Sequence, residues 1–93
     1  YERLLPFAPT NVDTYNNLGL TLFYLGNSTE ALRRLNEGVA VNPKHQRIWL
    51  TLGFVNGQLG DLVQARIALT NAVELGADTP VGQSAASMLE NLP

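Results

Sequence analysis

The chain contains no cysteine and only one histidine, one methionine and one tryptophan among its 93 residues. Without cysteine, disulfide bonds and thiolate metal sites are excluded, and the redox compartment cannot be read from the sequence. Lysine and arginine number 6 against 8 aspartates and glutamates, so the basic surface typical of nucleic-acid-binding modules is missing. No apolar run approaches the roughly 18 residues that a transmembrane helix needs. We therefore expect no nucleic-acid partner and no membrane insertion by this segment.

What is present is the composition of one small globular domain. Hydrophobic residues make up 45% of the chain and charged residues 15%, which is too apolar for a disordered tail. The length leaves room for a single domain and no more. The chain begins at Tyr1 rather than at a methionine, and we interpret it as an excerpt of a longer protein.

The sequence repeats itself at a spacing of 34 residues. Leu18 and Gly19 align with Leu52 and Gly53, and the remaining identities are nearly all apolar residues or glycine. They pair Leu25 with Leu59, Gly26 with Gly60, Ala31 with Ala65, Leu35 with Leu69 and Val39 with Val73. Because positions between these pairs differ freely, we infer that packing maintains the repeat.

This register divides the single domain, residues 1–93, into four parts. They are the end of a preceding repeat (residues 1–11), repeat one (12–45), repeat two (46–79) and a degenerate or capping helix (80–93).

Each repeat is predicted to form two helices. Tyr15, Leu18, Leu22 and Leu25 recur at spacings of three and four, which predicts a helix from about residue 13 to residue 25 with these side chains facing inward. The second repeat predicts helices at about 46–59 and 62–75, and the last helix is expected at about 80–91, starting after Thr79 and Pro80.

The turns inside the repeats carry helix-end signals. Gly26 and Gly60 suit the left-handed residue just past a helix. Asn27 is expected to cap the following helix together with Glu30, as Asp61 does with Gln64.

Gly19 and Gly53 lie inside predicted helices, where glycine costs about 1 kcal/mol relative to alanine. We therefore expect a close approach of the neighbouring helix at both positions, with Ala31 and Ala65 as the matching small residues.

This pattern resembles the tetratricopeptide repeat family. The signature residues are Tyr15, Leu18, Gly19, Gly26, Ala31 and Pro43 in the first repeat and Trp49, Leu52, Gly53, Gly60 and Ala65 in the second. The resemblance implies an all-α fold of antiparallel helix-turn-helix repeats stacked as a right-handed α-solenoid. One departure is Asn56, which occupies a position where the family usually has a large apolar or aromatic residue and which needs hydrogen-bond partners if it is buried.

The resemblance also implies a non-catalytic protein–protein interaction scaffold whose first helices line a concave groove. At 100° per residue, the side of these helices opposite the inward stripe carries more apolar residues than a solvated face should. The predicted partner-binding residues are Asn16, Leu20, Phe23, Tyr24, Leu50 and Phe54. We expect them to bind a peptide or helix of a partner protein of unknown identity. Core packing is the alternative role for Leu20, Phe23 and Phe54, and solvation is the alternative for Asn16.

One subset of the family grips a carboxyl terminus with lysine and asparagine side chains in the groove. None of the matching positions here is basic; they are Asn16, Leu20, Thr51, Val81 and Ala85. The resemblance therefore implies no such clamp, and we expect mainly apolar contacts that depend weakly on salt.

Nothing in the sequence indicates an enzyme, a cofactor or a metal site. His45, the one histidine, is expected in an exposed linker that leads into a helix. Glu30 and Glu37 are expected to form surface ion pairs with Arg33 and Arg34 rather than an acid–base pair.

A structural role is the alternative function. The segment 1–7 would lack a covering helix, and the low charge would then favour self-association. In that case the domain would hold a homo-oligomeric assembly together.

Overall fold

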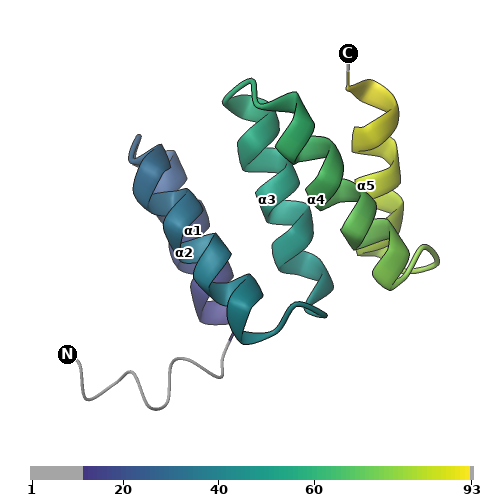
Figure 1. Ribbon diagram of the computed structural model, residues 1–93, viewed down its shortest axis with the longest axis horizontal. Coiled ribbons are helices and arrows are strands. Elements are labelled where there is room, and N and C mark those ends of the chain that lie inside the picture. Colours follow the sequence, from purple (N-terminus) through teal and green to yellow (C-terminus); the bar gives the residue numbers. More distant parts are fainter. Residues whose placement is uncertain (1–11, 93) are drawn as a thin grey trace.

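The computed structural model describes residues 12–92, which form five helices joined by short connections (Figure 1). The helices are α1 (Val12–Tyr24), α2 (Ser28–Val41), α3 (Gln46–Gln58), α4 (Leu62–Leu75) and α5 (Pro80–Asn91). No strand occurs within this part of the chain, and the predicted all-α fold is confirmed. The segment assigned to the end of a preceding repeat, residues 1–11, lies outside the described residues.

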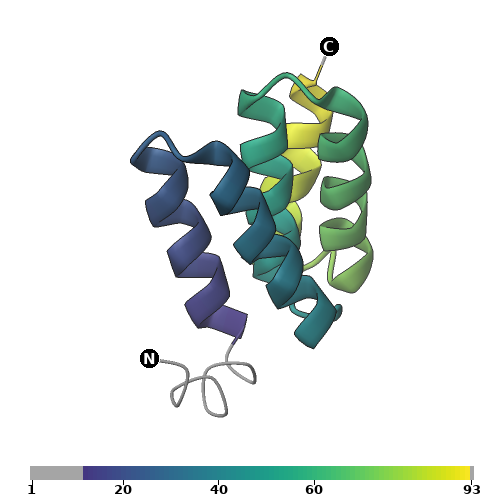
Figure 2. The ribbon, with the colours of Figure 1, turned by 60° about the vertical axis from the view of Figure 1, so that its left-hand side comes forward.

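The helices form two hairpins followed by a single helix. Helices α1 and α2 pair with each other, α3 and α4 form the second pair, and α5 packs against α3 and α4 (Figures 1 and 2). Helix α1 also contacts α3, and α3 contacts α5. Helices α1, α3 and α5 therefore lie in a row with α3 in the middle, while α2 and α4 cover the other side of this row. The Cα atoms extend over 42 × 28 × 17 Å, which is the shape of a slab two helices thick.

Both turns inside the hairpins use the predicted glycines. Gly26 and Gly60 have φ values of 87° and 85°, in the left-handed region where glycine is least strained. The residue after each glycine donates a hydrogen bond from its backbone N–H to the carbonyl five residues earlier. These bonds run from Asn27 to Leu22 and from Asp61 to Asn56. These bonds complete a Schellman motif at the end of each first helix.

The two predicted helix caps differ. The Asp61 carboxylate accepts a hydrogen bond from the Gln64 backbone N–H at 3.2 Å, as expected. Asn27 occupies the equivalent position but makes no side-chain cap bond, so that prediction was wrong. The Asn27 backbone N–H already donates to Leu22, and the Glu30 carboxylate is held instead by Arg34 at 3.1 Å and Arg33 at 3.5 Å.

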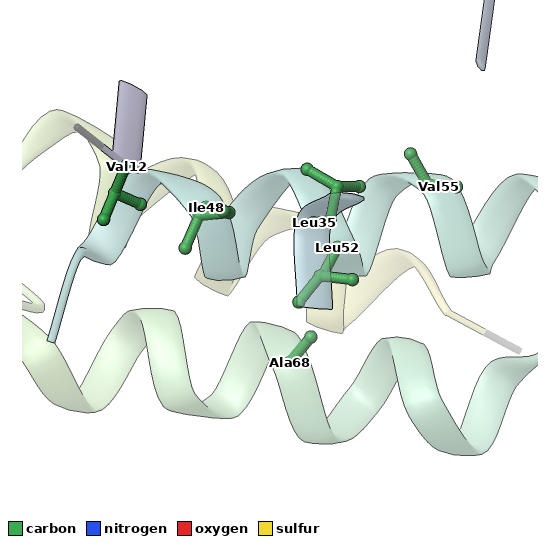
Figure 3. Packing of buried hydrophobic residues seen from close by; sticks show 6 residues of the cluster. All are labelled: Val12, Leu35, Ile48, Leu52, Val55 and Ala68. Carbon is green, nitrogen blue, oxygen red and sulfur yellow. The ribbon is translucent and has the colours of Figure 1, made fainter. Parts of the chain in front are cut away.

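The main core cluster joins the two hairpins. It consists of Val12, Leu35, Ile48, Leu52, Val55 and Ala68, which come from all four hairpin helices (Figure 3). A second cluster of Leu69, Ala72 and Ala85 joins α4 to α5.

The inward stripe predicted for the first helix needs correction. Leu18 is 37% exposed and Leu25 is 75% exposed, whereas the buried residues of α1 are Val12, Asn16 and Gly19. Leu52, the counterpart of Leu18, is only 3% exposed because it lies in the cluster that contains residues of α2 and α4. Periodicity identified an apolar side of α1, but burial depends on a neighbouring helix on that side.

The two helical glycines lie at close helix contacts, as predicted, but their partners are not the expected alanines. A Cβ atom added to Gly19 would lie 2.5 Å from Leu35 Cγ, and one added to Gly53 would lie 2.5 Å from Leu69 Cγ. Each glycine therefore accommodates a leucine of the paired helix, while Ala31 and Ala65 are themselves fully buried.

His45 has a structural role that the sequence did not reveal. It is the N-cap of α3, where its Nδ1 lies 3.4 Å from the Ile48 backbone nitrogen, and its Nε2 lies 2.8 Å from Asp13 Oδ1. His45 therefore connects the start of α3 to the first turn of α1. His45 lies in the connection that leads into α3, as predicted, but it is partly buried rather than exposed.

Candidate functional site

A groove of about 250 Å³ lies where α1, α3 and α5 meet. It is lined by Asn16, Leu20 and Tyr24 of α1, by Arg47, Leu50, Thr51 and Phe54 of α3, and by Met88 of α5. These residues share a surface because α1, α3 and α5 pack side by side, so that equivalent positions of these helices face the same side of the molecule. We call this surface the groove.

Five of the six residues predicted to bind a partner line the groove. Phe23 does not. It packs against the main core cluster, and its ring meets the rings of Phe54 and Tyr24 edge-on at centroid distances of 5.6 and 5.5 Å. Phe23 therefore supports the groove wall from behind.

The apolar residues of the groove differ in how firmly the core holds them. Phe54 packs against the main core cluster and Leu50 against the second one. Leu20 is partly buried but packs against neither cluster, and Tyr24 is 72% exposed. Of the apolar residues, Leu20 and Tyr24 are therefore the least tied to the core.

Asn16 is the buried polar residue of the groove. It is 3% exposed, and its Oδ1 has no hydrogen-bond partner within the described part of the chain. A buried amide oxygen without a partner costs about 1–3 kcal/mol.

Sequence reasoning did not name three residues of the groove wall as binding residues. Arg47 and Thr51 come from α3, and Met88 comes from α5. The angular position of Arg47 on its helix was a usable signal, because it lies on the same side as Leu50 and Phe54. Met88 had no such signal, since its place depends on how α5 docks against α3.

A second hollow of about 420 Å³ adjoins the groove, because Phe54 and Met88 line both. Its other walls include Gly57 of α3, Leu62 of α4 and Leu92 after α5. Mostly apolar side chains thus continue from the groove toward the end of α5.

Residues 12–92 offer little basis for a metal site, a membrane-spanning helix or an acid–base pair. This part of the chain holds no group of three or more histidine or acidic side chains placed to bind a metal ion. Its helices include none with the length and apolar character needed to cross a membrane. The acidic residues of α2 form surface ion pairs, with Arg34 3.0 Å from Glu37 and 3.1 Å from Glu30.

Comparison with known proteins agrees with the helical repeat. Residues 1–33 match the profile of the tetratricopeptide repeat family. Tetratricopeptide repeat protein 7B of Mus musculus and of Homo sapiens are both 34% identical to this chain over 80 residues, which are 86% of the chain. The match spans about 10% of the length of these relatives.

Members of this family generally act as protein–protein interaction modules and non-catalytic scaffolds. The repeated signature, the paired helical hairpins and these sequence matches agree, and the chain belongs to the tetratricopeptide repeat family.

Proposed function

We propose that this chain binds a peptide or helix of a partner protein in the groove. The observation that carries the proposal is the set of partly exposed apolar side chains, Leu20, Leu50 and Phe54, around one hollow of about 250 Å³. Apolar side chains gathered in a concave surface are typical of interaction sites. A bound helix or extended segment would insert apolar anchors between them.

The polar residues of the groove indicate which hydrogen-bonding and charged groups the partner should carry. The Asn16 Oδ1 is buried and has no hydrogen-bond partner among the described residues, and a turn of the side chain toward the groove would present it to a donor of the bound segment such as a backbone N–H. Arg47 is exposed at the same surface and suits a carboxylate. With one cation in the groove, we expect binding to weaken only slightly as salt is raised.

The test uses Leu20, because it lines the groove without packing in either core cluster. Peptides selected from a random library on the immobilised chain would be measured by fluorescence anisotropy. Leu20→Asn should weaken binding by about 10-fold to 100-fold, since it removes the burial of one leucine side chain. Its melting temperature should change little.

The matched control is Leu25→Asn, one residue past the end of the same helix, where Leu25 is 75% exposed and outside the groove. It should bind the same peptides as the wild type. If Leu20→Asn also bound them with unchanged affinity, the groove would not be the binding surface. Phe54 is a poorer probe, because truncating it also disturbs the core.

Self-association is the second candidate function. It is favoured by the exposure of Leu18 and Leu25, on a side of α1 that no described helix covers. Sedimentation velocity from micromolar to millimolar concentration would detect it, and exchanging both leucines for asparagine should then restore the monomer. A wild-type chain that stays monomeric at the highest concentration would exclude this role.

A further inference from the structure

A second cleft opens on the side of the molecule away from the groove. It has a volume of about 280 Å³ and lies between α2 and α4, with side chains of α3 also lining it. Its apolar walls include Leu32, Trp49 and Ile67, and its polar residues include Asn36, Asn56 and Asp61. We call it the α2–α4 cleft. Asn56 stands where the family usually has a large side chain, so a smaller polar group faces this space.

Two asparagine side chains of the cleft leave only their amide oxygens unbonded, beside the Gln64 side-chain amide, which can both donate and accept. Asn56 is 8% exposed and uses its Nδ2 to donate to the Leu52 carbonyl at 3.0 Å. Asn36 donates in the same way to the Leu32 carbonyl at 2.8 Å. Neither amide oxygen has a hydrogen-bond partner among residues 12–92. An amide whose nitrogen is engaged by its own helix presents only an acceptor to its surroundings.

Asp61 adds a negative charge to these acceptors. Its carboxylate caps α4 by accepting from the Gln64 backbone N–H at 3.2 Å, which occupies one of its two oxygens. Among the described residues that line the cleft, none carries a positive charge. The α2–α4 cleft therefore combines two amide oxygens and a carboxylate with an apolar wall that includes an indole ring.

We propose that the α2–α4 cleft binds the side chain of an arginine presented by a partner protein. A guanidinium group carries five N–H donors and no acceptor, which complements the two amide oxygens and the carboxylate of the cleft. Its methylene stem can lie along the apolar wall while its charge approaches Asp61. The Trp49 indole is held by a hydrogen bond from Nε1 to the Pro43 carbonyl at 2.7 Å, and a fixed indole ring is a favourable surface for a guanidinium group.

The probe for this site is N-acetyl-L-arginine amide, titrated into the isotope-labelled chain and followed by two-dimensional NMR. We expect saturable shifts of the Asn36 and Asn56 side-chain amide signals and of the Trp49 indole signal. The dissociation constant should be about 1–10 mM, as for a ligand of this size with a few polar contacts. Shifts that grow linearly without saturation would overturn the proposal.

Two variants test the acceptors separately. Asn56→Leu removes the buried amide oxygen and fills part of the cleft, so saturable binding should be lost. Asp61→Asn keeps a good helix cap but removes the charge, and affinity should fall by about 3-fold to 10-fold. Unchanged affinity in both variants would show that the cleft is not the binding site.

Three related probes test the chemistry. N-acetyl-norleucine amide has an apolar stem without donors, N-acetyl-lysine amide has the charge without the planar group, and N-acetyl-tyrosine amide has an aromatic ring. Each should bind more weakly than the arginine compound, and equal or tighter binding of any of them would overturn the assignment to arginine. Leu20→Asn should leave arginine binding unchanged, so failure of this site and failure of the groove can be told apart.

Discussion

At the scale of single residues, Gly53 and Gly57 show how the surroundings of a glycine decide its role. They lie one turn apart in α3. A Cβ atom on Gly53 would lie 2.5 Å from Leu69 Cγ, which is the branch point of a side chain only 1% exposed. A Cβ atom on Gly57 would lie 4.0 Å from the Ala65 Cβ, an ordinary contact distance. One glycine is therefore required by packing and the other is not.

We predict opposite effects for the two alanine substitutions. Gly53→Ala should lower the free energy of unfolding by about 1–3 kcal/mol, because the leucine must move in a packed interior. Gly57→Ala should raise it by up to about 1 kcal/mol, because alanine is the better helix former and its Cβ would make only an ordinary contact with Ala65. Urea denaturation of both variants measures the difference. If Gly53→Ala were as stable as Gly57→Ala, the close contact between α3 and α4 would be contradicted.

At the scale of helices, Gln46 connects α3 to the end of α4 and the start of α5. Its Nε2 donates to the carbonyls of Ala72 at 2.7 Å and Gly76 at 2.8 Å. Its Oε1 accepts a hydrogen bond from the Thr79 hydroxyl at 2.9 Å, and Thr79 Oγ1 in turn accepts from the Gly82 backbone N–H at 3.0 Å and so caps α5. One side chain thus organises the connection that orients α5, and α5 in turn supplies Met88 to the groove.

We predict that Gln46→Ala lowers the free energy of unfolding by about 1–3 kcal/mol, because the carbonyls of Ala72 and Gly76 and the Thr79 hydroxyl each lose one hydrogen bond. Amide hydrogen exchange should also speed up in the first turn of α5. Gln58→Ala is the control, since Gln58 is exposed in the same helix and should change stability by less than about 0.5 kcal/mol. Equal stability of the two variants would mean that Gln46 does not hold this connection.

At the scale of the whole molecule, α3 is the central helix. It contacts each of the other four helices, and its buried residues include Ile48, Leu52 and Val55. Helix α1 has its main contacts with α2 and α3 and has fewer buried residues. In a stack of repeats, stability comes from interfaces with neighbours, so helices with fewer neighbours open more readily.

We therefore predict that backbone amides of α3 exchange with solvent at least about tenfold more slowly than those of α1, a difference of about 1.4 kcal/mol in opening free energy. Residue-resolved hydrogen exchange by NMR measures this. Equal protection of α1 and α3 would instead indicate that the described helices open together in one step.

The sequence by itself determined the helices and the turns. Gly26 and Gly60 end the first helices, and Thr79 with Pro80 starts α5, because these are local preferences that need no distant partner. The groove residues Leu20, Leu50 and Phe54 were also predictable, since equivalent positions on stacked helices face the same side.

Only the tertiary structure decided which of the apolar residues are buried and what the polar ones contact. Leu18 and Leu52 occupy the same place in the repeat, yet only Leu52 is buried, because helices α2 and α4 cover it. His45 and Asp13 are 32 residues apart and meet only when the hairpins pack. Burial and long-range hydrogen bonds depend on which elements become neighbours, and the local periodicity of a sequence does not contain that information.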